Sequence, residues 1–478
     1  MTVDAQEQPQ SSPAAHQNRL EPTARTAVPL LEPREGVPPV IADEEALAAT
    51  VAAFAAGTGP VAVDAERASG YRYSQRAYLV QLRRAGAGTA LIDPVACPDL
   101  GALNEVIADA EWVLHAATQD LACLRQTGLE PRHLFDTELG GRIAGYPRVG
   151  LGPMVEDLLG FSLEKGHSAA DWSTRPLPEP WLRYAALDVE LLVELSDAVR
   201  RDLAAQGKLD WAEQEFASVL AAAPNPPRAE PWRRTSGIHR VRRPRNLAVV
   251  RALWEARDAL ARRRDMTPGR VLPDAAIIDA ATAPPATLQQ LRAVPGFSGR
   301  TRSADAVGYF AAMNEALELA EEKLPSAQPP HEGPPPVKAW ERQAPQAAAR
   351  LAVARPAVAA IADEHLLPVE NLLSPDLLRR LCWTPPRDLE DETITAALRA
   401  GGARPWQAEL TAHVIARALR RVEMEAAVAP ATADSDRPEN KSDRANSAKA
   451  KKAATPNSAA AADAGDSHSD SDGDSAPA

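Results

Sequence analysis

Short apolar runs alternate with helix-like segments between residues 41 and 215, and this alternation restricts the fold more than any other feature. Such a pattern is typical of an α/β domain. The first runs follow one another without a helix between them, which predicts an antiparallel meander that enters a mixed sheet. The expected strands are Val61–Asp64, Ala77–Leu82, Thr89–Ile92 and Glu111–His115. The expected helices are Glu44–Ala55, Leu100–Ala110, Gln119–Gln126, Thr137–Ala144, Gly152–Leu159 and Trp181–Ala205.

Proline-rich linkers divide the rest of the chain. We expect linkers at residues 216–237 and 325–338, which separate helical domains at 238–324 and 339–425. A Val-Leu-Pro-Asp segment after Arg270 and a Leu-Leu-Pro-Val-Glu segment from Leu366 suggest that the two helical domains are diverged copies of one unit. Two terminal segments contain few apolar side chains that folding could bury, so we expect a disordered arm and a disordered tail there. They are residues 1–40 and 426–478.

The composition is that of a globular protein of a reducing compartment. Of the 478 residues 45% are hydrophobic, and no run of about 18 uncharged apolar residues predicts a membrane span. The N-terminus shows no secretory signal, and the three cysteines have no paired spacing. We therefore expect a cytoplasmic protein without a zinc site or a disulfide framework.

Charge is distributed unevenly along the chain. The net charge of −12 argues against a nucleic-acid ligand for the chain taken as a whole. Residues 231–250, however, contain six arginines and no acid. Local charge sets the attraction for phosphate, so this segment is a candidate nucleic-acid contact.

Two carboxylates share one face of the first long strand. Asp64 and Glu66 lie two residues apart at the end of an apolar run, so they point to the same side of the sheet. Hard divalent cations prefer oxygen ligands of this kind. Taken alone, the pair fits two solvated acids at a strand terminus better than a metal site.

Two further acids, Asp120 and Asp188, lie on or next to expected helices. Asp120 follows an apolar strand and a short loop, near the start of a helix, and Asp188 lies four residues after Tyr184 on a later helix. Residues four apart share a helix face, so this phenol and carboxylate lie side by side. Each element alone is more easily explained as an ordinary helix feature, and only the combination of all three is informative.

In this order, the three elements resemble the DEDD superfamily of 3′–5′ exonucleases, in its tyrosine-containing branch. The likeness covers about residues 41–215, and it is close to the ribonuclease D family at positions in three segments. They are Phe135-Asp136-Thr137, the residues Lys165, Asp171, Trp172, Arg175, Pro176 and Leu177, and Tyr184-Ala-Ala-Leu-Asp188. The resemblance implies a ribonuclease H-like α/β domain.

The resemblance also implies roles for single residues. Asp64, Glu66, Asp120 and Asp188 match the four metal-binding carboxylates, and Tyr184 matches the residue that positions the attacking water. Two ions, Mg²⁺ or Mn²⁺, would then activate water and stabilise the leaving oxygen. We expect a structural role for Asp136. His115 fits a hydrogen-bonded or packed residue better than a base or a ligand.

Residues from about 240 to 324 resemble an HRDC domain, a helical module that usually binds nucleic acid. The resemblance rests on the segments Leu253-Trp-Glu-Ala-Arg-Asp258 and Pro268-Gly-Arg-Val-Leu-Pro-Asp274. We expect six arginines to contact nucleic acid. They are Arg240, Arg242, Arg243 and Arg245 in this module and Arg67 and Arg175 near the metals. Tyr71, Tyr73 and Trp172 are candidates to stack on terminal bases.

Three functions remain open at this point. The first is an exoribonuclease that acts on RNA with a single-stranded 3′ end, such as a tRNA precursor. The second is a DNA 3′–5′ exonuclease of the repair type, because the same fold serves both substrates. The third is an inactive nucleic-acid-binding scaffold, against which the complete set of acids argues. The modular layout also leads us to expect a monomer without a membrane partner.

Overall fold

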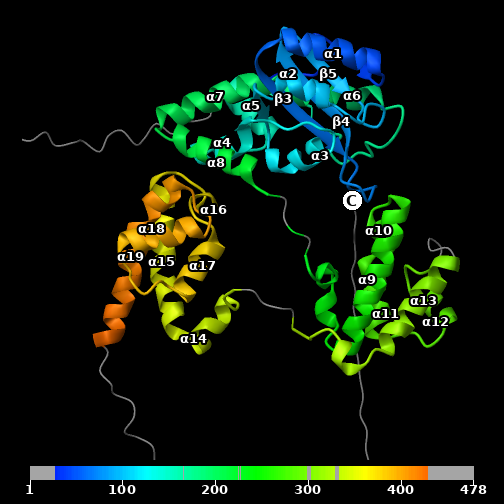
Figure 1. Ribbon diagram of the computed structural model, residues 1–478, viewed down its shortest axis with the longest axis vertical. Helices are drawn as coiled ribbons and strands as arrows, with labels where there is room; N and C mark the ends of the chain where they lie inside the picture. The colour runs from blue at the N-terminus through cyan, green and yellow to red at the C-terminus, as the bar shows by residue number, and fades with distance from the viewer. Residues whose placement is uncertain are drawn as a thin grey trace, which may run out of the picture. The chain divides into compact units, whose positions relative to one another are not determined.

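The structure is a computed structural model, and it describes residues 27–164, 166–223, 226, 228–298, 303–328 and 333–428. These residues form an α/β region followed by two helical regions (Figure 1). Lys165, which contributes to the family resemblance, lies outside the described residues. Residues 1–26 and 429–478 also lie outside them, so the disorder expected there stays a prediction.

A six-stranded mixed sheet forms the centre of the α/β region, with the strand order β2-β5-β4-β3-β6-β7. β3, β4 and β5 pair in antiparallel fashion, whereas β6 joins β3, and β7 joins β6, in parallel. The predicted meander that enters a mixed sheet is therefore confirmed. The strands are β2 (Val40–Ile41), β3 (Thr58–Arg67), β4 (Ala77–Ala85), β5 (Gly88–Ile92), β6 (Glu111–Leu114) and β7 (His133–Asp136).

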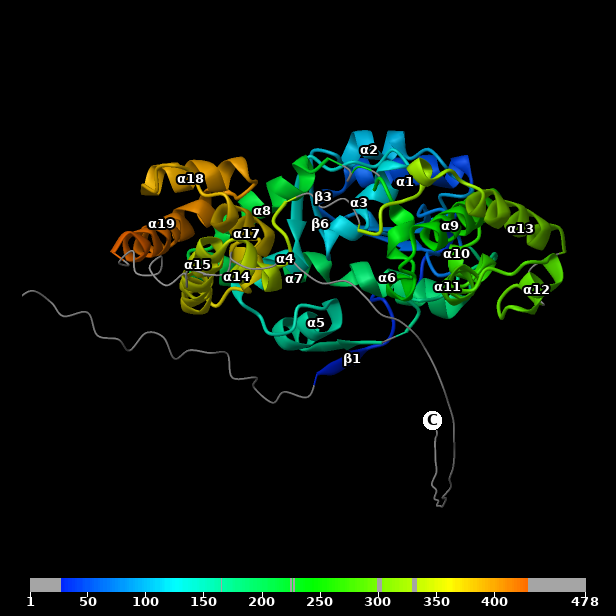
Figure 2. The same cartoon turned by 90° about the horizontal axis from the view of Figure 1, so that it is seen from below.

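Helices cover both faces of this sheet, with α1 and α2 on one side and α6 and α7 on the other (Figure 2). Val61, Ala62 and Val63 of β3 are fully or almost fully buried because the strand is covered on both faces. The single helix expected over Trp181–Ala205 is instead two helices, because the backbone at Leu191 leaves the helical region. The helices are α1 (Glu44–Ala56), α2 (Gly101–Ile107), α3 (Leu121–Arg125), α4 (Thr137–Ala144), α5 (Leu151–Leu159), α6 (Glu179–Glu190), α7 (Leu192–Ala205) and α8 (Leu209–Ala221).

The segment that precedes the sheet is ordered. Strand β1 (Val28–Leu30) pairs in parallel with β8 (Phe161–Leu163), and β2 begins at Val40. The expectation of a disordered arm is therefore wrong for residues 27–40. A strand of three residues carries no periodic pattern, and its partner lies more than a hundred residues away, so local composition could not reveal it.

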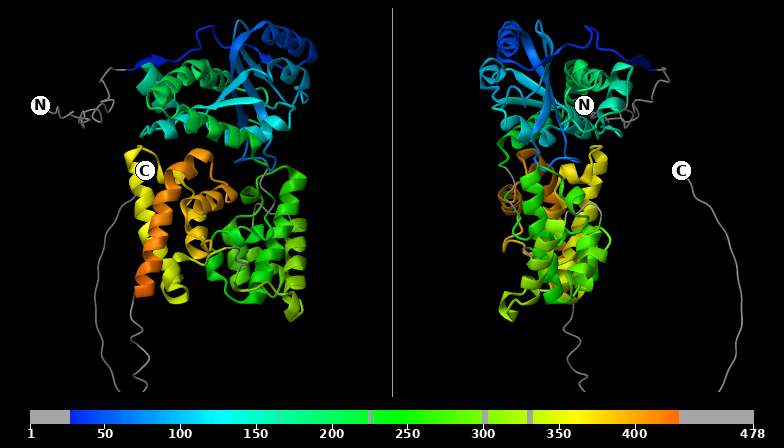
Figure 3. Two further views of the ribbon diagram at one scale, coloured as in Figure 1. Left: turned by 60° about the vertical axis from the view of Figure 1, so that its left-hand side comes forward. Right: turned by 90° about the vertical axis from the view of Figure 1, so that its right-hand side faces the viewer.

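The two helical regions, drawn in green and in yellow to orange in Figure 3, repeat one order of elements. In each region the first three helices have nearly equal lengths, of 21, 4 and 9 residues and of 20, 4 and 9 residues. Each long first helix is followed by a residue with positive φ, Asp265 at 45° or Leu366 at 54°. The structure thus supports the interpretation of two diverged copies.

The first copy consists of α9 (Pro244–Arg264), α10 (Pro268–Val271), α11 (Asp274–Thr282), α12 (Leu288–Ala293) and α13 (Ser303–Leu317). The second consists of α15 (Pro345–Glu364), α16 (Val369–Leu372), α17 (Pro375–Trp383), α18 (Asp391–Ala400) and α19 (Pro405–Val428), and α14 (Trp340–Gln343) precedes it. Among the described helices, none has both the length and the apolar character that a membrane crossing needs.

Asp136 connects two parts of the domain that meet beside the sheet edge. Its side chain caps α4 by accepting hydrogen bonds from the amides of Glu138 (3.0 Å) and Leu139 (3.1 Å). The same carboxylate accepts from the amides of Ala116 (3.0 Å) and Ala117 (2.8 Å), in the loop that leads to Asp120. The structural role expected for Asp136 is confirmed.

We predict that Asp136→Ala lowers the free energy of unfolding by about 3 kcal/mol, because a lost helix cap and unpaired buried amides each cost about 1–2 kcal/mol. Chemical denaturation followed by circular dichroism measures the change. The matched control is Asp43→Ala, which removes an exposed cap with one hydrogen bond, to the amide of Ala46 at 2.8 Å. Its expected cost is about 1 kcal/mol, and equal losses in the two variants would contradict the role of Asp136.

Candidate active site

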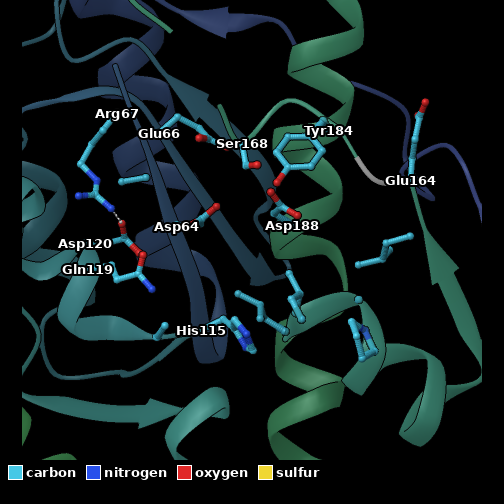
Figure 4. A pocket seen from close by; sticks show the side chains of 18 residues that line it. Asp64, Glu66, Arg67, His115, Gln119, Asp120, Glu164, Ser168, Tyr184 and Asp188 are labelled. Atoms are coloured by element: carbon cyan, nitrogen blue, oxygen red, sulfur yellow. Dashed lines mark ion pairs between the residues drawn. The ribbon is translucent and has the colours of Figure 1, made fainter. Parts of the chain in front are cut away.

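Three carboxylates from two elements converge beside the central strand. Asp64 and Glu66 point to the same side of β3, and Asp188 belongs to α6, which packs against that strand. One carboxylate oxygen from each of the three residues lies within 4.8 Å of the other two (Figure 4). The sequence prediction that these acids come together agrees with this geometry.

Asp120 completes the acidic set from the opposite side. It lies between the 3-10 turn η1 (Ala117–Gln119) and α3, and its carboxylate forms an ion pair with Arg67 at 3.5 Å (Figure 4). Asp120 lines the same pocket as Asp64, Glu66 and Asp188, and this pocket has a volume of about 570 Å³. The pocket therefore gathers all four acids that the sequence singled out.

The crowding of these acids changes their proton affinity. Burial, reinforced for Glu66 and Asp120 by the neighbouring carboxylates, raises the pKa of Asp64 to about 6, of Asp120 to about 8 and of Glu66 to about 10. Burial and Asp64 also raise the pKa of Asp188 well above its usual range. A set of hard oxygen donors that repel one another fits divalent cations, whose positive charge offsets the repulsion.

Tyr184 lies one helical turn before Asp188 and hydrogen-bonds to it through its hydroxyl group. Burial and the nearby carboxylates raise the pKa of this phenol above its ordinary value. The hydroxyl group is therefore protonated at neutral pH. It can orient a water molecule by hydrogen bonding, and it cannot act as a base there.

The same pocket includes residues that the sequence did not assign to the site. His115 lines it and forms a hydrogen bond from Nδ1 to the Thr137 hydroxyl group at 2.9 Å, in line with the expected hydrogen-bonded role. Burial lowers the pKa of His115 to about 4, so the ring is neutral at pH 7. Gln119, Glu164 and Ser168 also line the pocket, and only the position of Gln119 next to Asp120 could have indicated this.

The interpretation of Arg175 as a phosphate contact needs correction. Its guanidinium group donates to both carboxylate oxygens of Asp93, each at 2.7 Å. It also donates to the carbonyl groups of Trp172, Thr174 and Tyr78 at 2.7–2.8 Å. These contacts use the five N–H donors of an arginine, so Arg175 holds the loop before α6 in place and has no donor left for RNA.

The arginines of the first helical region divide into two kinds. Arg245 donates to the carbonyl groups of Leu317 and Leu319, both at 2.7 Å, so it serves the packing of this region. Arg240 forms an ion pair with Asp279 at 3.1 Å. Arg242 and Arg243 are exposed, and neither forms an ion pair with any residue in the described part of the chain. Of the four arginines predicted here as phosphate contacts, Arg242 and Arg243 are therefore the two whose charges have no ion-pair partner among the described residues.

The three aromatic candidates for base stacking all pack within the protein. Trp172 is fully buried. Tyr71 lies under the guanidinium group of Arg270, 4.0 Å from the ring centroid. Tyr73 donates its hydroxyl proton to Asp258 at 3.0 Å. Sequence proximity to Glu66 suggested a stacking role, whereas the actual neighbours of these rings come from distant segments.

Comparisons with known proteins agree with this site. A family model described as 3′-5′ exonuclease matches residues 39–204, a model described as HRDC domain matches 246–306, and one described as 3′ to 5′ exonuclease C-terminal domain matches 333–419. A ribonuclease D from Gluconacetobacter diazotrophicus is 32% identical over 69% of this chain and 82% of its own length. The fold and the acidic pocket thus define a 3′–5′ exonuclease.

Solved structures show the same relationship. A protein from Bifidobacterium adolescentis is 38% identical, with a TM-score of 0.77 over 82% of this chain and all of that one. Escherichia coli RNase D is 26% identical, with a TM-score of 0.58 over 80% of this chain and 98% of that one. Given these relatives, the chain belongs to the ribonuclease D family.

We predict that the metal-free protein loses stability as the pH rises from about 4, the ordinary carboxyl pKa, to about 10, the raised pKa of Glu66. The pKa values of Asp64, Asp120 and Glu66 in the folded protein exceed the ordinary values near 4, so their stabilising contribution is present at low pH. It is lost as the pH passes through the raised values. Melting temperatures measured in chelator at pH 5–9 should therefore fall more steeply for the parent protein than for Glu66→Gln. Added Mg²⁺ should remove this difference, and parallel curves in chelator would contradict the repulsion.

Proposed function

We propose that this chain is a 3′–5′ exoribonuclease that hydrolyses phosphodiester bonds at single-stranded RNA 3′ ends with the help of two divalent ions. The observation that carries this proposal is the convergence of oxygens from Asp64, Glu66 and Asp188 within 4.8 Å. The curated relatives bear the name ribonuclease D, and the E. coli enzyme is described as an exoribonuclease involved in structured RNA processing. By analogy, tRNA precursors and other stable RNAs are the substrates that we propose.

The pocket-lining acids would hold the ions. Asp64, Glu66, Asp120 and Asp188 offer only oxygen donors, which suits Mg²⁺ or Mn²⁺. When bound, two such ions supply a hydroxide-like nucleophile at neutral pH and offset negative charge on the leaving 3′ oxygen. The protonated hydroxyl group of Tyr184 would orient the attacking water, since it faces this acidic cluster.

Basic residues would hold the RNA. Arg67 is the single arginine in the described lining of the pocket, and it is close enough to Asp120 to meet a phosphate beside the scissile bond. Farther along the chain, we propose Arg242 and Arg243 as phosphate contacts, because their charges have no described partner. Arg240 contributes less, because Asp279 already pairs with it.

We predict that Asp64→Ala and Asp188→Ala each lower the rate of 3′ trimming by about a thousandfold or more, because each removes a ligand of the metal centre. Tyr184→Phe should retain more activity, with a loss of about 10- to 100-fold, since it removes only a positioning hydroxyl group. The measurement is stepwise shortening of single-stranded RNA labelled at its 5′ end, with and without Mg²⁺ or chelator.

Three controls accompany this measurement. DNA of the same sequence tests the preference for RNA, and faster loss from DNA would favour a repair-type nuclease. A 3′-labelled strand tests the direction of hydrolysis. Loss from the 5′ end, or full activity in chelator, would contradict the proposed chemistry.

We further predict that Arg242→Ala together with Arg243→Ala weakens RNA binding and flattens its salt dependence. Each phosphate contact with a single strand contributes about 0.7 to the slope of log K against log salt, so the slope should shrink by about 1.4. The matched control is Arg387→Ala with Arg399→Ala, which removes the same charge from exposed positions in the second helical region. Equal changes of slope in the two double variants would show a general charge effect and contradict a local contact.

A further inference from the structure

We propose that residues 27–38, here called the N-terminal strap, are a positioning element of the active site. The strap precedes the part of the chain that matches the 3′-5′ exonuclease model, which begins at residue 39. It contacts both walls of the acidic pocket that face Asp64 and Glu66. The inference rests on the proposed function, because it concerns how that site holds its geometry.

The first wall is strand β8. β1 pairs with it in parallel, with Leu30 opposite Leu163, and the amide of Val28 donates to the carbonyl group of Gly160 at 2.9 Å. Leu163 and the adjacent Glu164 line the acidic pocket. Within the described chain β8 has no strand partner besides β1, which runs beside it near α5 (Figure 2). Without the strap, a three-residue strand at the rim of the pocket would lose its hydrogen-bonded partner.

The second wall is α6, which carries Tyr184 and Asp188. Arg34 of the strap pairs with Glu194 at 2.8 Å and approaches the carboxylate of Glu190 to 3.8 Å. The side chain of Glu190 is fully buried, and its other described cation is Arg83 at 3.5 Å. A buried carboxylate depends on its cations, so Arg34 helps to fix the end of the helix two residues after Asp188.

A third contact joins the two walls. Glu32 of the strap pairs with Arg183 at 3.1 Å, and Arg183 also approaches Glu164 of the rim at 3.9 Å. Arg183 directly precedes Tyr184. In addition, Val37 packs against the apolar cluster that includes Trp172, and Tyr184 packs against the same cluster. The strap thus meets the pocket rim, the helix end and the surroundings of the tyrosine.

The strap adds little to the buried core. Leu30 and Val37 are only partly buried, whereas the core consists mainly of sheet and helix residues that follow the strap. Removal of the strap should therefore leave the domain folded but make β8 and α6, the two pocket walls, less firmly held. Because small misplacements of catalytic groups lower rates strongly, we expect a loss of turnover and not of folding.

The first test compares two truncations of the full chain on single-stranded RNA with Mg²⁺. Removal of residues 1–26 leaves every contact described here intact and should keep the parent kcat. Removal of residues 1–38 should lower kcat about 10- to 100-fold and change KM by less than about threefold. Mn²⁺ affinity, measured by isothermal titration without RNA, should fall as well, because Asp188 is less well fixed. Parent-like kcat and Mn²⁺ affinity in the shorter protein would overturn the inference.

The second test separates positioning from folding. Arg34→Ala should lower kcat about fivefold or more, and Arg34→Lys should restore most of it because the cation beside Glu190 and Glu194 returns. The control is Arg132→Ala, which removes an exposed arginine paired with Asp109 at the surface and should leave kcat unchanged. A loss of activity in Arg34→Ala that follows the fraction of unfolded protein would overturn the inference. Inactivity of the untruncated protein would instead contradict the proposed function.

Discussion

Mutual repulsion among four crowded carboxylates is the constraint on which the rest of this structure depends. Asp64, Glu66, Asp120 and Asp188 share one pocket, and burial raises the pKa of all four. Such a cluster would push its own walls apart unless the backbone held each residue firmly or a cation neutralised the charge. The domain provides the backbone restraint and a single arginine, Arg67, among the described pocket residues. Divalent ions would neutralise the negative charge that Arg67 does not offset.

The restraint comes from residues that take no part in the chemistry. Asp136 accepts four amide hydrogen bonds and so fixes the loop before Asp120. Arg175, in the loop that leads into α6, donates all its N–H groups to Asp93 and to the carbonyl groups of Tyr78, Trp172 and Thr174, and so ties this loop to the sheet. Both residues belong to the ribonuclease D resemblance, which therefore extends beyond the acids that we propose as metal ligands to the groups that hold them in place. A charged residue near a site can thus be a structural requirement without touching substrate.

The sequence allowed the antiparallel meander around β3 and the convergence of the acids to be predicted, because the first depends on local spacing and the second on the order of the motifs. The sequence could not show which groups each charged side chain pairs with, because those groups meet only after folding. Arg175 and Arg242 look alike in sequence, yet one is fully paired and the other has no described ion pair. For the same reason the composition of residues 27–40 suggested disorder, although β1 finds a partner at Phe161–Leu163.

The two helical regions share one order of elements but differ in what they pack against. The second copy packs into the same apolar cluster as the exonuclease sheet, where Trp211 of α8 stacks on Trp406 with ring centroids 5.0 Å apart. Glu215 accepts hydrogen bonds there from Trp406 (2.9 Å) and Arg404 (2.6 Å). The first copy keeps its own core and follows the arginine-rich segment. A surface committed to packing cannot also bind phosphates, which is why we propose the RNA contacts of Arg242 and Arg243 in the first copy and none in the second.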